Sequence, residues 1–294
     1  YNGDNKLVCL ISEAAHGTNF ASAKLAGYKI EKVSVNKDGS LSVDDLEKKL
    51  KKKNIKTIHM VAPSFWAWRE GRVKTIKESV DLLLCLFPFE ESLLKNHNIN
   101  TQFIGHPLAK SIEKDIDMLS VRRDLEIQTE TLIAIMPGSR KAEINQHMEI
   151  LFEAAELIEQ ESYKNNNGDI QFIVPTVFSE SEEILKHSKP KLFKKFHFVK
   201  DSTKAISASD LVITKSGTST LQVALHKKPM IVIYRMSNAT YYFLKIFNLV
   251  KTKYAALPNI LFDDEIIPEL IQDNFTALNI YQESIKWLAN DERK

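Results

Sequence analysis

Short apolar runs alternate along most of the chain with longer segments whose apolar residues recur at helical spacing, and from about residue 55 onward this alternation is regular. The predicted strands are Thr57–Val61, Leu82–Leu86, Gln102–Ile104, Leu132–Met136, Gln171–Pro175, Phe196–Val199, Leu211–Thr214 and Met230–Tyr234. The predicted helices are Glu70–Ser79, Phe89–Asn96, Arg140–Gln160, Glu180–His187, Ser202–Ala208, Thr218–His226 and Ala239–Val250. Strands that are apolar throughout are typical of parallel sheets covered on both faces, so the pattern predicts a doubly wound α/β fold.

The segment before residue 55 has a different pattern. Its predicted elements are a strand at Leu7–Ile11, a helix at Ala21–Ala26 and a half-buried strand at Tyr28–Val35. Ser42, with Asp45 three residues later, resembles a capping box that begins a further helix. The lysine run Lys48–Lys53 suits the C-terminal end of that helix and is typical of a solvated surface.

Composition limits the classes of function. The chain has 294 residues, 44% of them hydrophobic, which is enough for one large or two medium domains. A break in composition at Lys110–Asp117 predicts the linker between two α/β units. Its 40 Lys and Arg nearly balance 38 Asp and Glu, so the basic excess of a nucleic-acid-binding protein is absent and no nucleic-acid partner is expected. Cys9 and Cys85 lie far apart, which indicates neither a disulfide framework nor a zinc site.

The ends and the longest apolar runs bear on location. Runs such as Leu82–Phe87 are far shorter than the roughly 18 residues of a spanning helix, and the polar start at Tyr1 does not resemble a signal peptide. We therefore expect a cytoplasmic protein. Because the first residue is not Met, we also expect a fragment or a processed product.

The first candidate binding feature follows the predicted strand Leu132–Met136. Pro137-Gly138-Ser139-Arg140 then leads into a long helix, so unpaired backbone N–H groups and the helix dipole favour a phosphate there. Gly138 allows close approach of the backbone, Ser139 can cap the helix or bind an oxygen, and Arg140 can bind an anion. Glu143 lies one turn further and could hold Arg140 or bind a hydroxyl. The alternative is a capped helix with a surface arginine.

A second feature repeats this logic after Leu211–Thr214. Ser216, Gly217 and Thr218 form a hydroxyl-rich turn before a helix, and Gln222 one turn later could reach a ribose hydroxyl. The turn lacks the ending of a Walker loop. In a doubly wound sheet both turns lie at the carboxyl ends of strands, where ligands bind. Two such anion-binding turns in one domain favour a ligand that carries a diphosphate.

Weaker features leave alternatives open. His106 could be a base, although a lone histidine is more often structural, and the two indoles of Trp66 and Trp68 could form an acceptor platform or belong to the core. The aromatic helix around Tyr241–Phe247, with its nearby lysines, fits an interfacial membrane contact or packing within the domain or at a homodimer contact. No metal-ligand spacing and no GxSxG elbow are found in the sequence, so no metal or cofactor is expected.

Several motifs in order resemble one family, over roughly residues 54–294. They are Pro63–Arg69, Phe87–Glu90, Phe103–Leu108, Met136–Arg140 with Glu143, Lys215–Thr220, Tyr234-Arg235 and Leu257–Leu261, in the order found in lipid-A-disaccharide synthases. The resemblance implies two Rossmann-like domains of a GT-B glycosyltransferase. It implies transfer of 2,3-diacylglucosamine from UDP-2,3-diacylglucosamine to 2,3-diacylglucosamine 1-phosphate, with inversion and release of UDP and no obligatory metal. It also implies a place at the cytoplasmic face of the inner membrane of Gram-negative bacteria.

The resemblance also assigns site residues. The UDP diphosphate would be held by Gly138, Ser139 and Arg140 together with Ser216, Gly217 and Thr218, and Arg140 would stabilise the leaving group. Glu143 and Asn259 resemble site residues as well. Gln222 stands where the family usually has a glutamate, which predicts weaker or altered hydroxyl binding.

The start of the chain departs from the family. The Gly-rich first loop and the Asp-Ala-Pro-Asp-Phe motif expected upstream of Ile55 are absent from the sequence, and residues 1–53 instead resemble a fragment of the glycine decarboxylase P-protein. We therefore expect a chimera with a foreign segment at 1–53, a remnant of the acceptor-binding domain at 54–115 and the UDP-sugar domain at 116–294. The family's aspartate candidate for the general base falls in the missing part, which leaves the base unknown and activity open.

Two alternatives to a glycosyltransferase remain at this point. The chain could be a nucleotide-binding or partner-binding remnant without catalysis. It could also be a pyridoxal-phosphate decarboxylase module, although the N-terminal segment carries no recognisable Schiff-base lysine motif.

Overall fold

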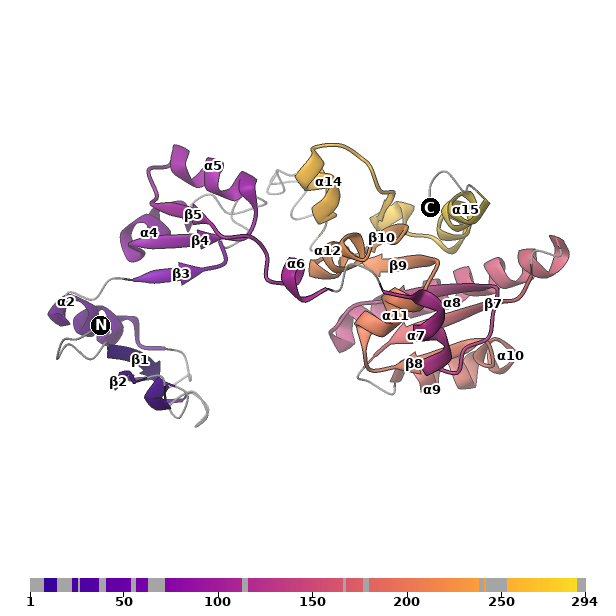
Figure 1. Cartoon of the computed structure of the whole chain (residues 1–294), viewed down its shortest axis with the longest axis horizontal. Helices are drawn as coiled ribbons and strands as arrows, with labels where there is room; N and C mark the ends of the chain where they lie inside the picture. The colour runs from indigo at the N-terminus through magenta and orange to yellow at the C-terminus, as the bar shows by residue number, and fades with distance from the viewer. Residues whose placement is uncertain are drawn as a thin grey trace. The chain divides into compact units, whose positions relative to one another are not determined.

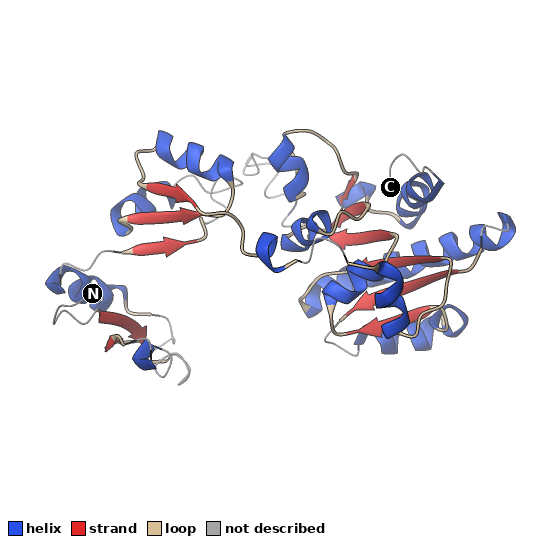
Figure 2. Cartoon of the chain, viewed as in Figure 1, coloured by secondary structure: helices blue, strands red, loops and turns tan. Residues whose placement is uncertain are grey.

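The computed structural model describes residues 8–14, 23–25, 27–36, 41–53, 57–62, 72–112, 116–165, 168–176, 180–237, 241 and 253–289. The chain forms two compact units, one made of residues 1–62, 72–85 and 91–102 and the other of residues 63–71, 86–90 and 103–294. Within the described residues there are three sheets, of two, three and six strands. The cartoons show each sheet with its own helices (Figures 1 and 2).

The two-stranded sheet pairs β1 (Val8–Ser12) with β2 (Lys29–Val33) in parallel and is followed by helix α2 (Val43–Lys53). The predicted cap is present, because the Ser42 hydroxyl accepts a hydrogen bond from the Asp45 N–H at 3.3 Å. The reciprocal half of the capping box is replaced. The Asp45 carboxylate accepts from the N–H and the hydroxyl of Ser34 and pairs with Lys49, which ties α2 to the end of β2.

The three-stranded sheet has the order β3-β4-β5. Its elements are β3 (Ile58–Met60), α4 (Arg72–Ser79), β4 (Leu82–Cys85), α5 (Pro88–Asn96) and β5 (Thr101–Phe103). The buried Glu90 carboxylate accepts hydrogen bonds from the N–H groups of Leu86 and Phe87, so Glu90 itself caps the first turn of α5.

The six-stranded sheet has the order β11-β10-β9-β6-β7-β8. Its strands are β6 (Thr131–Met136), β7 (Ile170–Pro175), β8 (Phe196–Val199), β9 (Leu211–Lys215), β10 (Met230–Tyr234) and β11 (Glu269–Ile271). The helices of this unit are α6 (Leu108–Ser111), α7 (Met118–Asp124), α8 (Lys141–Asn165), α9 (Glu180–Ser188), α10 (Pro190–Phe193), α11 (Ser202–Ala208), α12 (Thr218–Leu225), α14 (Leu257–Phe262) and α15 (Ala277–Ala289), with the 3-10 turn η1 (Gln272–Asn274). The chain runs outward from β6 to β8, returns to β9 beside β6, and then runs outward to β11.

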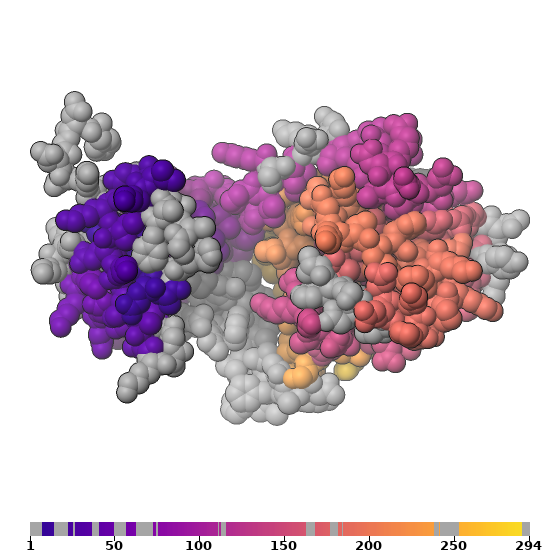
Figure 3. Space-filling model, turned by 90° about the horizontal axis from the view of Figure 1, so that it is seen from below, coloured from indigo at the N-terminus to yellow at the C-terminus, as the bar shows by residue number. Residues whose placement is uncertain are grey.

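Helices cover both faces of this sheet, as the apolar strands predict. Ile133 and Ile135 of β6 contribute to a core with α8, α9, α10 and α15, whereas Leu132 and Ala134 contribute to a second core with α11 and α12. Successive residues of a strand point to opposite faces, so one strand contributes to both cores. The space-filling view shows the orange later part of the unit packed against its pink earlier part (Figure 3). The fold is therefore the doubly wound α/β fold that the hydrophobic pattern predicts.

A buried ion pair joins α7 to the sheet. The Arg122 guanidinium donates to the Asp210 carboxylate at 2.7 Å and to the Ala208 carbonyl at 2.8 Å. The same Asp210 oxygen accepts from the Leu132 N–H at 2.7 Å. The Arg122 side chain is only 8% exposed, so this network holds the start of β9 and the start of β6 together from within the protein.

The predicted elements agree with the structure in kind and differ at their ends. Helix α8 continues five residues past its predicted end at Gln160, to Asn165, and the predicted linker Lys110–Asp117 contains the end of α6 and Asp117, which caps α7 by accepting from the Leu119 N–H. The pattern does not predict α6, α7, α10, α14, β11 or α15. The aromatic helix predicted at 239–250 and the two indoles at 66 and 68 lie outside the described residues, apart from Tyr241, which is helical.

Among the helices that the structure describes, none has a stretch both long and apolar enough to cross a membrane.

Candidate functional site

The candidate site lies where the direction of the strand order reverses. Strands β6 and β9 are neighbours, and the helices that follow them, α8 and α12, pack against opposite faces of the sheet. The loops at the carboxyl ends of such a pair diverge and leave a crevice, which is the usual ligand site of an open α/β sheet. A cavity of about 310 Å³ opens at this point.

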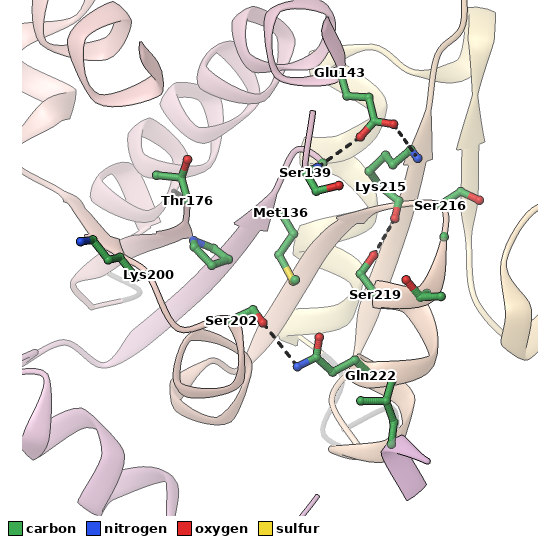
Figure 4. Close-up of a pocket in the computed structure, with 15 residues that line it drawn as sticks. Met136, Ser139, Glu143, Thr176, Lys200, Ser202, Lys215, Ser216, Ser219 and Gln222 are labelled. Atoms are coloured by element: carbon green, nitrogen blue, oxygen red, sulfur yellow. Dashed lines mark hydrogen bonds and ion pairs between the residues drawn. The ribbon is translucent and has the colours of Figure 1, made fainter. Parts of the chain in front are cut away.

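Both predicted glycine turns line this one cavity. Its walls include most of the residues predicted from the two turns, namely Gly138, Ser139, Glu143, Ser216, Gly217, Thr218 and Gln222. The remaining lining residues come from the ends of β6 to β9, from α6 and from the starts of α11 and α12, and they are Leu108, Met136, Pro175, Thr176, Lys200, Ser202, Lys215 and Ser219. The close-up shows how these side chains surround the cavity (Figure 4).

The conformations of the two turns require glycine. Gly138 has φ +128° and Gly217 has φ +151°, which L-residues rarely adopt. At Gly138 a Cβ atom would also lie only 2.5 Å from the Glu143 carboxylate, whereas at Gly217 the nearest atom is the Lys215 amine at 4.0 Å. Gly138 therefore makes room for a side chain, and Gly217 leaves open space beside the start of α12.

Hydroxyl groups of the second turn hold its backbone in shape. The Ser219 hydroxyl donates to the Lys215 carbonyl at 2.9 Å, and the Thr220 hydroxyl donates to the Gly217 carbonyl at 2.8 Å. The Ser216 hydroxyl donates to the Ala255 carbonyl at 2.7 Å, which connects the turn to the segment before α14. These bonds fix the loop, so its backbone N–H groups are preorganised for an anion.

A charged cluster occupies one end of the cavity. The Glu143 carboxylate lies 3.1 Å from the Lys215 amine and 3.3 Å from the Arg140 guanidinium, and it accepts a hydrogen bond from the Ser139 N–H at 3.2 Å. Burial raises the pKa of the Glu143 carboxyl. The hydrogen bond and charge of Lys215, together with Ser139 and Arg140, lower this pKa by more than burial raises it, so it lies below its usual value. Glu143 is therefore a carboxylate at neutral pH, and Lys215 is a cation of the site that the motif contains but the predicted set omits.

The other end of the cavity carries uncharged polar groups and one lysine. The Gln222 amide donates to the Ser202 hydroxyl at 3.4 Å and to the Thr203 hydroxyl at 3.2 Å. In the close-up, Thr176 and Lys200 lie at the left, across the cavity from Glu143 and Lys215, and Ser202 and Gln222 lie below (Figure 4). The cavity thus has an ionic end near α8 and a hydroxyl-rich end near α11.

A buried histidine supports the first turn from behind. The His147 ring, which is fully buried on α8, lies 2.8 Å through Nδ1 from the Pro137 carbonyl, and its Nε2 is 3.3 Å from both the N–H and the carbonyl of Arg235. Burial lowers the pKa of His147, more than the carbonyls of Pro137 and Arg235 raise it. Sequence reasoning missed this residue, because a histidine in the middle of a helix resembles any surface position.

Three other predicted residues lie outside the cavity lining. Arg140 is at its edge, with a side chain 82% exposed. Asn259 is fully buried, and its side chain bonds the backbone of Ile267 and the carboxylate of Glu269. The His106 ring accepts a hydrogen bond from the Leu108 N–H at the start of α6, which agrees with the structural alternative. Among the described residues, no three His, Cys, Asp or Glu side chains gather as a metal site would require.

Comparison with known proteins gives one family. The family model described as lipid-A-disaccharide synthetase matches residues 35–294, a range that takes in residues 35–53 of the segment expected to be foreign. A lipid-A-disaccharide synthase of Acinetobacter baylyi is 34% identical over 263 residues, which are 85% of this chain and 65% of that protein. The lipid-A-disaccharide synthase 2 of Legionella pneumophila is 37% identical over 261 residues, 86% of this chain and 64% of that protein.

Solved structures agree on the fold. The crystal structure of WaaG, a glycosyltransferase involved in lipopolysaccharide biosynthesis, aligns with a TM-score of 0.51 at 12% identity and covers 98% of this chain and 91% of that one. This likeness supports the GT-B arrangement of the fold and nothing finer. The chain spans about 57–65% of the length of the relatives first matched. The family model covers more than half of the chain, and the chain therefore belongs to the lipid-A-disaccharide synthase family.

Proposed function

We propose that this chain is the UDP-sugar-binding part of a lipid-A-disaccharide synthase. Its reaction would transfer 2,3-diacylglucosamine from UDP to 2,3-diacylglucosamine 1-phosphate with inversion and release UDP. The observation that carries the proposal is the cavity at the β6–β9 reversal, because both glycine turns line it. One glycine turn alone would not distinguish a diphosphate site from an ordinary helix start. Family membership supports the sugar nucleotide as the ligand.

The geometry suits a diphosphate leaving group. As the glycosidic bond breaks, negative charge grows on the phosphate oxygens of UDP, and preorganised N–H groups with nearby cations stabilise such charge. The turns at Gly138 and Gly217 would supply the N–H groups, and Arg140 and Lys215 would supply the charges. Ser139, Ser216 and Thr218 would line the diphosphate, Gln222 would bind a ribose hydroxyl, and Asn259 would act through the buried packing of α14.

Inversion also requires a general base that removes the proton of the acceptor hydroxyl. The residues that line the cavity include no histidine and no aspartate, and Glu143 is engaged by Lys215. The base therefore stays unassigned, and catalytic turnover by this chain is the open part of the proposal.

Binding of UDP to the full chain tests the proposal. We expect calorimetry to detect UDP binding and Arg140→Ala to weaken it by about 1.5–3 kcal/mol, the scale of a charge-assisted hydrogen bond. Lys186→Met, an exposed position on α9 outside the cavity lining, is the matched control and should leave the affinity unchanged. Equal affinity of the Arg140 variant and the wild type would refute the role of Arg140.

A second assay separates an enzyme from a binding remnant. The other candidate is a binding remnant without catalysis, because the cavity lining includes no histidine and no aspartate that could act as the general base. Formation of the disaccharide from UDP-2,3-diacylglucosamine and 2,3-diacylglucosamine 1-phosphate, lost in Arg140→Ala, would exclude it.

The decarboxylase resemblance of residues 1–53 stays a prediction with its own test. An imine absorbance band after addition of pyridoxal phosphate, made permanent by borohydride, would favour a decarboxylase module.

We also propose, from the family resemblance, a peripheral place at the cytoplasmic face of the inner membrane, and a homodimer contact is the alternative use of the aromatic segment at 241–247. Sedimentation of the chain with anionic vesicles, and its mass in solution, test these two proposals.

A further inference from the structure

We infer that the Glu143 carboxylate is a built-in competitor for the diphosphate site, and that Lys215 is a diphosphate-binding cation which Glu143 occupies while the site is free of ligand. The inference rests on the proposed function, in which Lys215 supplies charge to the diphosphate, and it adds an opposing role for Glu143. Glu143 would lower the affinity for UDP, and Lys215 would raise it.

Three donors converge on one carboxylate. The Glu143 carboxylate lies 3.1 Å from the Lys215 amine and 3.3 Å from the Arg140 guanidinium, and it accepts a hydrogen bond from the Ser139 N–H at 3.2 Å. A backbone N–H at a helix start combined with two cations is the set of donors that binds a phosphate oxygen. The carboxylate therefore makes the contacts that a phosphate of the ligand would make.

These groups lie within the candidate diphosphate site. Glu143, Ser139 and Lys215 all line the cavity, and the close-up shows the carboxylate directed at both partners across the top of it (Figure 4). The side chains of Glu143 and Lys215 are 18% and 19% exposed, so the ion pair is only partly screened by water. A salt bridge that only stabilised an exposed helix surface would not have to line a cavity.

The Glu143 side chain fills the space beside Gly138. A Cβ atom there would lie 2.5 Å from the Glu143 carboxylate oxygen and 2.9 Å from its Cβ atom. Glycine at this turn therefore accommodates the glutamate side chain. The Glu143 carboxylate already accepts a hydrogen bond from the Ser139 N–H of this turn, so a phosphate oxygen could take that N–H only after the carboxylate has moved.

Charge decides the direction of the effect. A diphosphate that enters beside an intact carboxylate meets like charge, and Lys215 cannot bind both anions fully at the same time. The apparent affinity is the intrinsic affinity multiplied by the fraction of molecules in which the carboxylate has left the site. Removal of the carboxylate should therefore tighten binding, the opposite of what a ligand-binding or purely structural glutamate would show.

The experiment measures the affinity of the full chain for UDP, with uridine as a ligand that lacks the diphosphate. Glu143→Gln should bind UDP about tenfold more tightly and uridine with unchanged affinity. Lys215→Met should bind UDP at least about tenfold more weakly. Glu149→Gln removes the same charge from an exposed position on the same helix and should match the wild type.

Each outcome has one meaning. Tighter UDP binding by Glu143→Gln and weaker binding by Lys215→Met support the inference. Equal or weaker UDP binding by Glu143→Gln overturns it. Glu143→Ala removes the carboxylate without adding an amide, and it should also bind UDP more tightly than the wild type. Thermal unfolding of each variant shows that it is folded. If the wild type itself does not bind UDP, the proposed function fails. If the wild type binds UDP but Glu143→Gln does not bind it more tightly, only this inference fails.

Discussion

The six-stranded sheet and the three-stranded sheet both contain parallel strand pairs, but their strands are buried to different degrees. In β6, Leu132, Ile133 and Ile135 are all fully buried, because helices cover both faces. In β3, Ile58 is 64% exposed and Met60 is 54% exposed. Parallel strands depend on cover from both sides, so an apolar strand does not by itself show that the sheet around it is complete.

The difference also locates the binding chemistry. The six-stranded sheet reverses its strand order between β6 and β9, and this reversal creates the cavity. The three-stranded sheet keeps the simple order β3-β4-β5 and has no such reversal among its described strands. Ligand binding therefore depends on the completeness of the second unit, and the two sheets should differ in how much each substitution destabilises them.

The largest effect is expected at the buried ion pair of the second unit. Asp210→Ala would leave Arg122 buried without its carboxylate and remove the acceptor of the Leu132 N–H, so it should cost about 3–5 kcal/mol of unfolding free energy. Urea unfolding followed by circular dichroism measures the loss. Glu283→Gln breaks a pair with Lys286, which is 58% exposed, and should cost less than about 1 kcal/mol. Equal losses in the two variants would show that the Arg122 network does not hold the sheet.

A pair of smaller substitutions compares the sheets directly. Ile135→Ala in β6 creates a cavity in a fully buried core and should cost about 2–5 kcal/mol. Ile58→Ala in β3 removes mostly exposed atoms and should change stability by about 0.5 kcal/mol or less. The same urea experiment measures both. A large loss at Ile58 would mean that β3 is covered in solution, and the contrast between the sheets would then disappear.

The fold could be predicted from sequence wherever the strands are continuous and apolar. Strands β6, β7, β9 and β10 were predicted nearly to the residue, because both faces of each are buried. Short elements were missed for a physical reason. Helix α6 has four residues and β11 has three, too few to show a period, and α7 lies in a charged segment whose packing depends on the buried Arg122.

The site was predicted by its backbone and missed in its side-chain contacts. The glycine turns could be recognised because positive φ requires glycine and because each turn follows a strand. The pairing of Glu143 with Lys215 joins residues 72 positions apart, and only the neighbouring positions of β6 and β9 bring them together. Asn259 could be associated with the family motif, but its burial against Glu269 depends on tertiary packing that no local pattern shows.

The smallest effect concerns the first unit and is an effect of pH. The hydrogen bond from Lys49 is the largest of the causes that lower the pKa of Asp45 from 3.8 to about 2, with a further contribution from the Ser34 N–H. A carboxyl whose pKa is lowered by folding adds stability above its unfolded value, and that contribution is lost as the pH falls through the folded value. The contact between α2 and β2 should therefore weaken between pH 3.8 and about 2.

Carboxyl-carbon NMR of Asp45 measures this pKa in the full chain. In Lys49→Met we expect the pKa of Asp45 to rise toward 3.8, because the main cause of its lowering is gone while the Ser34 contacts remain. Asp45→Asn should remove the pH dependence of the Ser34 amide signal over the same range. An Asp45 pKa near 3.8 in the wild type would show that α2 does not hold to β2 in solution, and the first unit would then be even less firmly folded than its exposed strands indicate.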